Sequence, residues 1–219
     1  MSVASLTAAA LVACGGKTAR PKGGATNTGG PSTTSYAGLF VDRTATYRYS
    51  FESSMYDPDD PEANDAGMVV EKTTADITCT TTTRTAGAWR LAELTCADDG
   101  NAMVTSDIEG IYATRPGGLW KLDAGMTADD DALAALAGTP PLLAEAQAPV
   151  EDRHGEDDDA FGTVHAVRAA GAGWCIEDSG WGGDESGTTI CIDPVRGVTR
   201  ATRYFAGGST RDEALELVD

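Results

Sequence analysis

The chain has 219 residues, of which 41% are apolar and 23% charged, which is typical of a globular protein rather than of a collagen or a disordered chain. Acidic residues outnumber basic residues by 34 to 16, which gives a formal net charge of −18. A nucleic-acid-binding protein needs a basic surface to meet phosphate, so this charge argues against nucleic acid as a partner.

The N-terminus has the features of an export signal. The apolar stretch from Val3 to Val12 is typical of a short secretory h-region, although no Lys or Arg precedes it. The next residues, Leu11-Val12-Ala13-Cys14, resemble the lipobox of bacterial lipoproteins, Leu-x-Ala/Gly-Cys. This resemblance implies that residues 1–13 are a signal peptide and that Cys14 carries acyl chains after cleavage. The alternative interpretation is a buried helix start with an incidental cysteine.

Residues 14–35 are expected to connect this anchor to the folded domain. They are rich in Gly, Ser, Thr and Pro and show no apolar periodicity, so they cannot bury enough surface to fold. In the Gram-negative lipoproteins that the chain resembles, Asp after the cysteine favours the inner membrane. Gly15 stands there instead. We therefore expect a cell-envelope protein, anchored in the membrane through Cys14, and the outer membrane facing the periplasm or the exterior is favoured.

From residue 44 onward the sequence alternates between apolar and polar residues, as half-buried strands do. In residues 44–54, for example, Tyr47, Tyr49 and Phe51 alternate with polar residues. The predicted strands are 44–54, 67–84, 89–96, 108–115, 119–122, 160–169, 173–177, 188–193 and 198–205.

A pair of helices is predicted in the middle of the chain. Thr127 as N-cap and Gly138 as the closing glycine define a helix over 128–137. Thr139-Pro140 then starts a second short helix that runs to residue 147.

The last predicted element is a short C-terminal helix. Thr210-Arg211-Asp212-Glu213 is a capping box before Ala214, Leu215 and Leu217. Together the elements predict one α+β domain over residues 36–219, dominated by an antiparallel sheet that forms a curved sheet or an unclosed half-barrel.

Four cysteines follow Cys14, and they lie as two pairs, symmetric about Gly87 and about Gly183 in the glycine-rich connection 178–187. Facing residues of a hairpin come within disulfide range, and an exported compartment lets such bonds persist. A metal site of four thiolates is the alternative, but the chain has no Cys-x-x-Cys. The predicted disulfides are Cys79–Cys96 and Cys175–Cys191.

One tripeptide suggests catalysis. Asp178-Ser179-Gly180 resembles the nucleophile segment of chymotrypsin-like proteases, and His154 or His165 could complete a triad. However, Glu177 stands where that family has glycine, and neither histidine lies in its usual context. We therefore predict a solvent-exposed loop and no catalytic residues.

Two acidic segments could bind a cation. His154 lies in the run 151–159, and residues 57–67 offer several carboxylates. The second segment has Glu62 where an EF-hand requires glycine, and charge runs are usually solvated loops. Trp174 and Trp181 beside Cys175 favour core packing over a ligand platform. We therefore predict neither a metal nor a cofactor.

The predicted architecture and the strand Gly118-Leu119-Trp120 are similar to the lipoprotein-localisation-factor class, whose members are half-barrels with helices over an apolar cavity. This similarity implies non-enzymatic binding of a lipid or a lipoprotein. The alternative is a structural or protein-interaction module with an acidic surface and a filled core. A lipid carrier needs an open apolar cavity of several hundred Å³, whereas an interaction module has a filled core. Which of the two is present depends on how much of the apolar sheet face the leucines of the predicted helical pair cover. These leucines are Leu133, Leu136, Leu142 and Leu143.

Overall fold

The computed structural model describes residues 36–55, 68–97, 102–155, 161–182, 184–207 and 209–218. The predicted signal peptide and the predicted tether, including Cys14, lie outside these residues. The described residues form one antiparallel sheet of twelve strands with two short α-helices, which is a mainly β fold rather than α+β with a helical pair. None of the helices in the described ranges is long and apolar enough to cross a bilayer.

The elements follow one another in chain order from a 3-10 helix, η2 (Ala37–Leu39), to the last strand. The strands are β1 (Arg43–Met55), β2 (Met68–Ala86), β3 (Trp89–Ala97), β4 (Gly110–Arg115), β5 (Gly118–Leu122), β6 (Leu143–Ala144), β7 (Val150–His154), β8 (Gly162–Ala170), β9 (Gly173–Trp181), β10 (Glu185–Asp193), β11 (Gly197–Ala206) and β12 (Ser209–Leu217). The helices are α1 (Met103–Ile108) and α2 (Asp130–Leu136).

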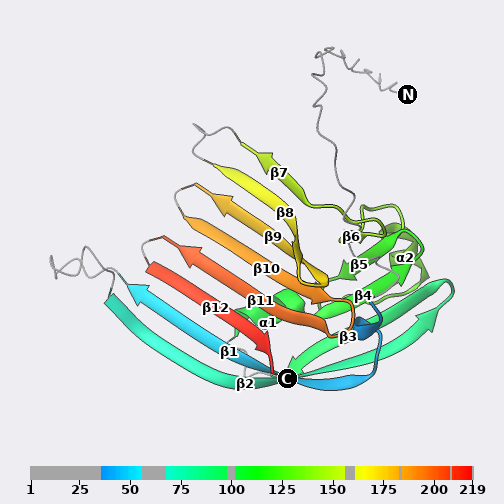
Figure 1. Cartoon of the computed structure of the whole chain (residues 1–219), viewed down its shortest axis with the longest axis horizontal. Helices are drawn as coiled ribbons and strands as arrows, with labels where there is room; N and C mark the ends of the chain where they lie inside the picture. The colour runs from blue at the N-terminus through cyan, green and yellow to red at the C-terminus, as the bar shows by residue number, and fades with distance from the viewer. Residues whose placement is uncertain are drawn as a thin grey trace, which may run out of the picture.

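The sheet runs in the order β6-β5-β4-β3-β2-β1-β12-β11-β10-β9-β8-β7. The first and last strands therefore pair with each other in the middle of the sheet. Its two edges, β6 and β7, are consecutive in the sequence and do not pair. The result is an open sheet that curves around α1 (Figure 1).

Strand alternation places a continuous band of apolar side chains on the face that packs against α1, which we call the concave face. Directly paired residues of six neighbouring strands share this face. In α1, Val104 and Ile108 are fully buried in the same core, together with Tyr36 and Leu39 around η2. The band, here called the apolar row, consists of Tyr49, Leu215, Ala201, Ile190, Ile176 and Val167.

A second, smaller core lies on the opposite face of β3–β5. Trp89 and Trp120 contact each other edge to face there, with 5.3 Å between ring centroids. Leu133 and Leu136 of α2 cover them. Because α1 and α2 pack on opposite faces, the concave face is covered by α1 and η2 and not by the predicted helical pair.

The two predicted disulfides are both present. Cys79 faces Cys96 across β2 and β3, and Cys175 faces Cys191 across β9 and β10. Gly87, with φ of +57°, makes the tight β2–β3 turn that sets the first pairing. The first bridge belongs to the concave core. The second projects from the other face, since neighbouring Ile176 belongs to that core.

The helix predictions need three corrections. The helix predicted over 128–137 is the shorter α2, and its N-cap is Asp129, which accepts a hydrogen bond from the Ala132 N–H at 2.9 Å. The second helix, predicted to run to residue 147, is absent. Its segment instead forms β6, which pairs with β5, so that Leu143 is fully buried.

The predicted C-terminal helix is also wrong, because residues 209–217 form β12. This strand pairs with β1 on one side and β11 on the other, and Glu213 and Leu215 alternate into the core. Two ladders of hydrogen bonds and buried alternate side chains outweigh the capping box, which is a local preference of about 1 kcal/mol.

Three further elements differ from the sequence-based prediction. Residues 103–108 form α1 rather than a loop that leads into a strand starting at 108. The charged segment 150–154 is the edge strand β7. In the glycine-rich connection, β9 continues to residue 181 and β10 begins at 185, so most of that segment is strand.

Candidate functional site

Beyond the apolar row, toward the β9–β10 and β11–β12 turns, the concave face becomes polar. The strands are longer than the core that α1 and η2 cover, so the next residues of each strand project from the same face beside that core. They form two rows across β12 to β7, which we call the first and second polar rows. The first consists of Glu213, Arg203, Thr188, Asp178, His165 and Asp152. The second consists of Arg211, Phe205, Ser186, Gly180, Thr163 and His154.

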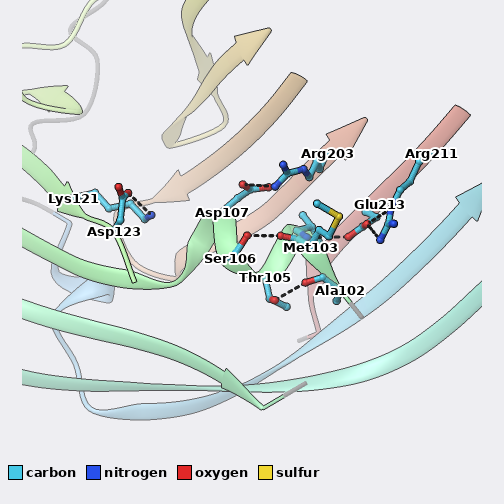
Figure 2. Close-up of polar contacts among 11 residues, drawn as sticks. Ala102, Met103, Thr105, Ser106, Asp107, Lys121, Asp123, Arg203, Arg211 and Glu213 are labelled. Atoms are coloured by element: carbon cyan, nitrogen blue, oxygen red, sulfur yellow. Dashed lines mark hydrogen bonds and ion pairs between the residues drawn. The ribbon is translucent and has the colours of Figure 1, made fainter. Parts of the chain in front are cut away.

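One ion pair and one hydrogen bond join these rows to α1 (Figure 2). Arg203 Nη1 lies 3.1 Å from Asp107 Oδ1, at the C-terminal end of α1. The Arg211 guanidinium lies 2.6 Å from Glu213 Oε1, and Glu213 Oε2 accepts a hydrogen bond of 2.9 Å from the Val104 N–H. A strand carboxylate therefore caps the start of α1, whose own N-cap residue offers no side-chain hydrogen bond.

The carboxylates of this α1 contact are largely removed from water. The Glu213 side chain is only 1% exposed and that of Asp107 16%. Burial raises the pKa of Asp107, and the neighbouring Arg203 and Lys121 offset part of that rise. Lys121 is itself partly buried, which lowers its pKa. These groups fix the position of α1 on the sheet.

The predicted Asp–Ser–His arrangement is assembled only in part. His165 Nδ1 and Asp178 Oδ1 lie 2.7 Å apart, facing each other on β8 and β9. Ser179 follows Asp178 on the same strand and therefore projects from the opposite face. The structure thus brings the histidine and the aspartate together and keeps the serine away from them.

His154 contacts Asp152 on its own strand, at 3.4 Å between Nε2 and Oδ2. Among the described residues, no group of three or more His, Cys, Asp or Glu side chains is placed to hold a metal ion. The acidic segment 57–67 and residues 156–159 of the other acidic run lie outside the described residues.

The two tryptophans near Cys175 do not form a joint platform. Trp174 is 2% exposed in the concave core. Trp181 lies seven positions further along β9 and covers Gly162, where a Cβ would lie 2.0 Å from its ring. An odd separation along a strand puts the two rings on opposite faces.

A hollow of about 400 Å³ lies between the two polar rows. Its lining includes His165, Asp178, Thr188 and Arg203 of the first row and Thr163 and Ser186 of the second. Gly180 leaves the space between Thr163 and Ser186 open, because it has no side chain there.

Two further hollows lie on the same half of the sheet. One, of about 370 Å³, adjoins Phe51, Thr73 and Arg211 on the concave face. The other, of about 530 Å³, is lined by opposite-face residues of β1, β2, β11 and β12, among them the exposed ion pair between Lys72 and Glu52. Its charged walls include this exposed ion pair, as those of the hollow between the polar rows include the exposed pair of His165 and Asp178.

Neither a protein-family model nor a curated protein matches this sequence. The site is therefore defined by its geometry. Sequence reasoning singled out His154, His165 and Asp178 but missed Arg203, Arg211, Glu213 and Asp107. The sequence around these four residues shows no motif that marks a site, because only the register of the strands brings their side chains together.

Proposed function

We propose that this protein is a non-enzymatic binding protein of the cell envelope, anchored in the membrane through Cys14, and that the two polar rows are its ligand surface. The observation that carries the proposal is the hollow of about 400 Å³ between these rows. The lipobox and the two disulfides support the envelope location, because disulfides persist in oxidising compartments.

The distribution of polarity over the concave face supports a ligand surface at this end. The part under α1 and η2 is filled by buried apolar side chains such as Val104, Ile108 and Tyr47. The polar end keeps hydrogen-bonding groups in reach of solvent, with His165 and Asp178 side chains 45% and 63% exposed. Small-molecule sites combine such a hollow with a few convergent polar groups.

The placement of Ser179 supports binding rather than hydrolysis. A serine nucleophile must lie within hydrogen-bond reach of its histidine. Ser179 and His165 project from opposite faces of the sheet, so this pair cannot act together.

Photocrosslinking in cells tests the proposal. Benzoylphenylalanine at position 188 reports what touches the hollow, and the same group at 189 is the matched control. Thr188 and Thr189 are adjacent threonines of β10, both half-buried, and they project from opposite faces. We expect a discrete envelope adduct from position 188 and none from 189. An adduct only from 189, or none from either position, would contradict the proposed surface.

A lipid ligand is the second candidate, because the sheet is an unclosed curve with an apolar row on its inner side. An acyl chain could reach that row only if α1 moved away, since Val104 and Ile108 are fully buried against it. Titration of the disulfide-intact protein with a fluorescent fatty acid tests this candidate. A saturable signal supports it, and the absence of one refutes it.

A further inference from the structure

We infer that the ligand of the hollow between the polar rows is a neutral oligosaccharide. The inference rests on the proposed function, because it names the chemical class of ligand that the same surface takes. It depends on three features of the rows: the pairing of their charges, the spacing of their hydroxyl and planar polar groups, and one exposed aromatic ring.

The charged side chains of the polar rows are already paired with one another or with α1. Arg203 binds Asp107, Arg211 binds Glu213, and the His165 and His154 rings contact Asp178 and Asp152. An anionic ligand would have to displace a carboxylate from one of the two arginines. It would also approach a protein of net charge −18. A ligand without charge meets neither obstacle.

The polar groups repeat at the spacing of the strands. Neighbouring strands lie about 4.8 Å apart, so His165, Asp178 and Thr188 of the first row present one polar group per strand. In the second row Gly180 of β9 presents none. Thr163 and Ser186 supply hydroxyl groups in the second row, and Thr188 and Asp178 supply a hydroxyl and a carboxylate in the first. A pyranose unit is about as long as this spacing and carries several hydroxyls that both donate and accept hydrogen bonds.

Fixed planar groups make these hydrogen bonds directional. His165 Nδ1 and Asp178 Oδ1 contact each other at 2.7 Å, which restricts the orientation of both side chains. Arg203 is held by Asp107 at 3.1 Å. Side chains that are already ordered lose little further entropy when a hydroxyl-rich ligand binds, which favours affinity for a flexible saccharide.

An exposed aromatic ring lies next to the hollow, on the strand that pairs with Ser186 of its lining. Phe205 faces Ser186 in the second row and is 38% exposed, which is unusual for a phenylalanine. The C–H face of a sugar ring is apolar and packs on an aromatic ring, while its hydroxyl edge meets polar side chains. The hollow of about 400 Å³ lies within the range of small-molecule sites, roughly 300–1,000 Å³.

The test is binding of the full mature chain to a printed panel of neutral glycans, followed by calorimetry with the strongest binder. The panel includes oligomers of glucose, mannose, galactose and N-acetylglucosamine. Hyaluronan and chitosan oligomers serve as acidic and basic comparisons. We expect saturable binding to at least one neutral glycan and none to hyaluronan. The absence of binding to every neutral glycan, or tighter binding to a charged oligomer, would overturn the inference.

Matched variants locate the binding. Thr188→Trp fills the hollow and should weaken binding at least tenfold, whereas Thr189→Trp, on the other face, should leave it unchanged. Phe205→Ala should also weaken binding and is safe for folding because its ring is exposed. Equal losses in the variants of both faces would overturn the inference.

The crosslinked adduct from position 188 separates this inference from the proposed function. An adduct that stains for carbohydrate and resists protease supports both. An adduct that protease removes identifies a protein partner, which refutes the oligosaccharide and leaves the ligand surface in place. No adduct at 188, with glycan binding absent, refutes both.

Discussion

At the scale of single residues, Glu213 has the most consequential position in the molecule. It is an acidic residue of a central strand whose side chain is 1% exposed, between the Arg211 guanidinium and the Val104 N–H of α1. Burying a carboxylate is unfavourable unless hydrogen bonds and a counter-charge compensate, and here both do. Together with the Arg203–Asp107 ion pair, this residue joins the polar rows to α1.

Glu213→Ala should lower the free energy of unfolding by about 1–3 kcal/mol, because it leaves the Val104 N–H and Arg211 without their acceptor. Glu216→Ala is the control. It lies on the same strand, its side chain is 63% exposed, and its ion pair with Arg200 is long at 3.6 Å. An exposed pair of this kind contributes below about 1 kcal/mol. Urea unfolding of both variants would show the difference, and equal losses would contradict the assigned role.

The stability of the protein should depend on the titration of Asp107. Burial raises its pKa in the folded state above the ordinary 3.8, so the native protein holds this proton at pH values where the unfolded chain has released it. The contribution of Asp107 to stability therefore falls as the pH rises from 3.8 through the raised pKa.

This pH dependence should be absent from Asp107→Asn. Urea midpoints of the wild type and the variant, measured across the acid range, would show a difference that changes with pH only in that window. A constant difference at every pH would mean that the pKa of Asp107 is not raised.

At the scale of elements, the strands were the most predictable part of the chain and the helices the least. The nine strands predicted from alternation all correspond to strands of the sheet, with ends displaced by a few residues. The helices predicted from residues 139 and 210 rested on local capping motifs. Instead, the first segment pairs with β5 and the second pairs with β1 and β11. Alternation of apolar and polar residues reflects the burial of one face of a sheet, whereas a capping motif reflects only a local preference for helix.

The two disulfides should differ in what they contribute to stability. Their loops span 17 and 16 residues, so loop-closure entropy contributes about 3 kcal/mol in each case. Cys79 is 1% exposed in the concave core, whereas Cys175 and Cys191 are half-buried on the other face. Replacing Cys79 and Cys96 by Ala should therefore cost about 1 kcal/mol more than the same change at Cys175 and Cys191. Chemical unfolding of the two double variants measures this, and equal costs would contradict it.

At the scale of the whole molecule, the sheet order joins the ends of the domain at its centre. The pairing of β1 with β12 is the contact of longest sequence separation in the sheet, and both polar rows begin at β12. The site therefore requires the complete domain, because a chain without β12 lacks Arg211 and Glu213 and leaves α1 without its cap.

The membrane anchor is predicted from the sequence alone. Cys14→Ala should leave an unprocessed precursor and release the protein from the membrane, because each buried methylene of the acyl chains contributes about 0.8 kcal/mol to anchoring. Globomycin, which blocks the lipoprotein signal peptidase, should also leave a precursor. Detergent partitioning of the two samples measures the effect. Unchanged membrane association and processing would contradict the lipobox.

The sequence by itself determined nine of the twelve strands, the disulfide pairing and the position of α2, because alternation, hairpin symmetry and caps are local properties. It also carries the lipobox, which remains a prediction. Only the tertiary structure decided that α1 fills the concave face, that residues 209–217 are a strand and that Ser179 is turned away from His165. Those outcomes depend on register and on contacts between segments up to 170 residues apart, such as Tyr47 with Leu217. A one-residue shift in register would move every side chain of a row to the other face, so no local pattern could place Arg203, Asp178 and His165 together.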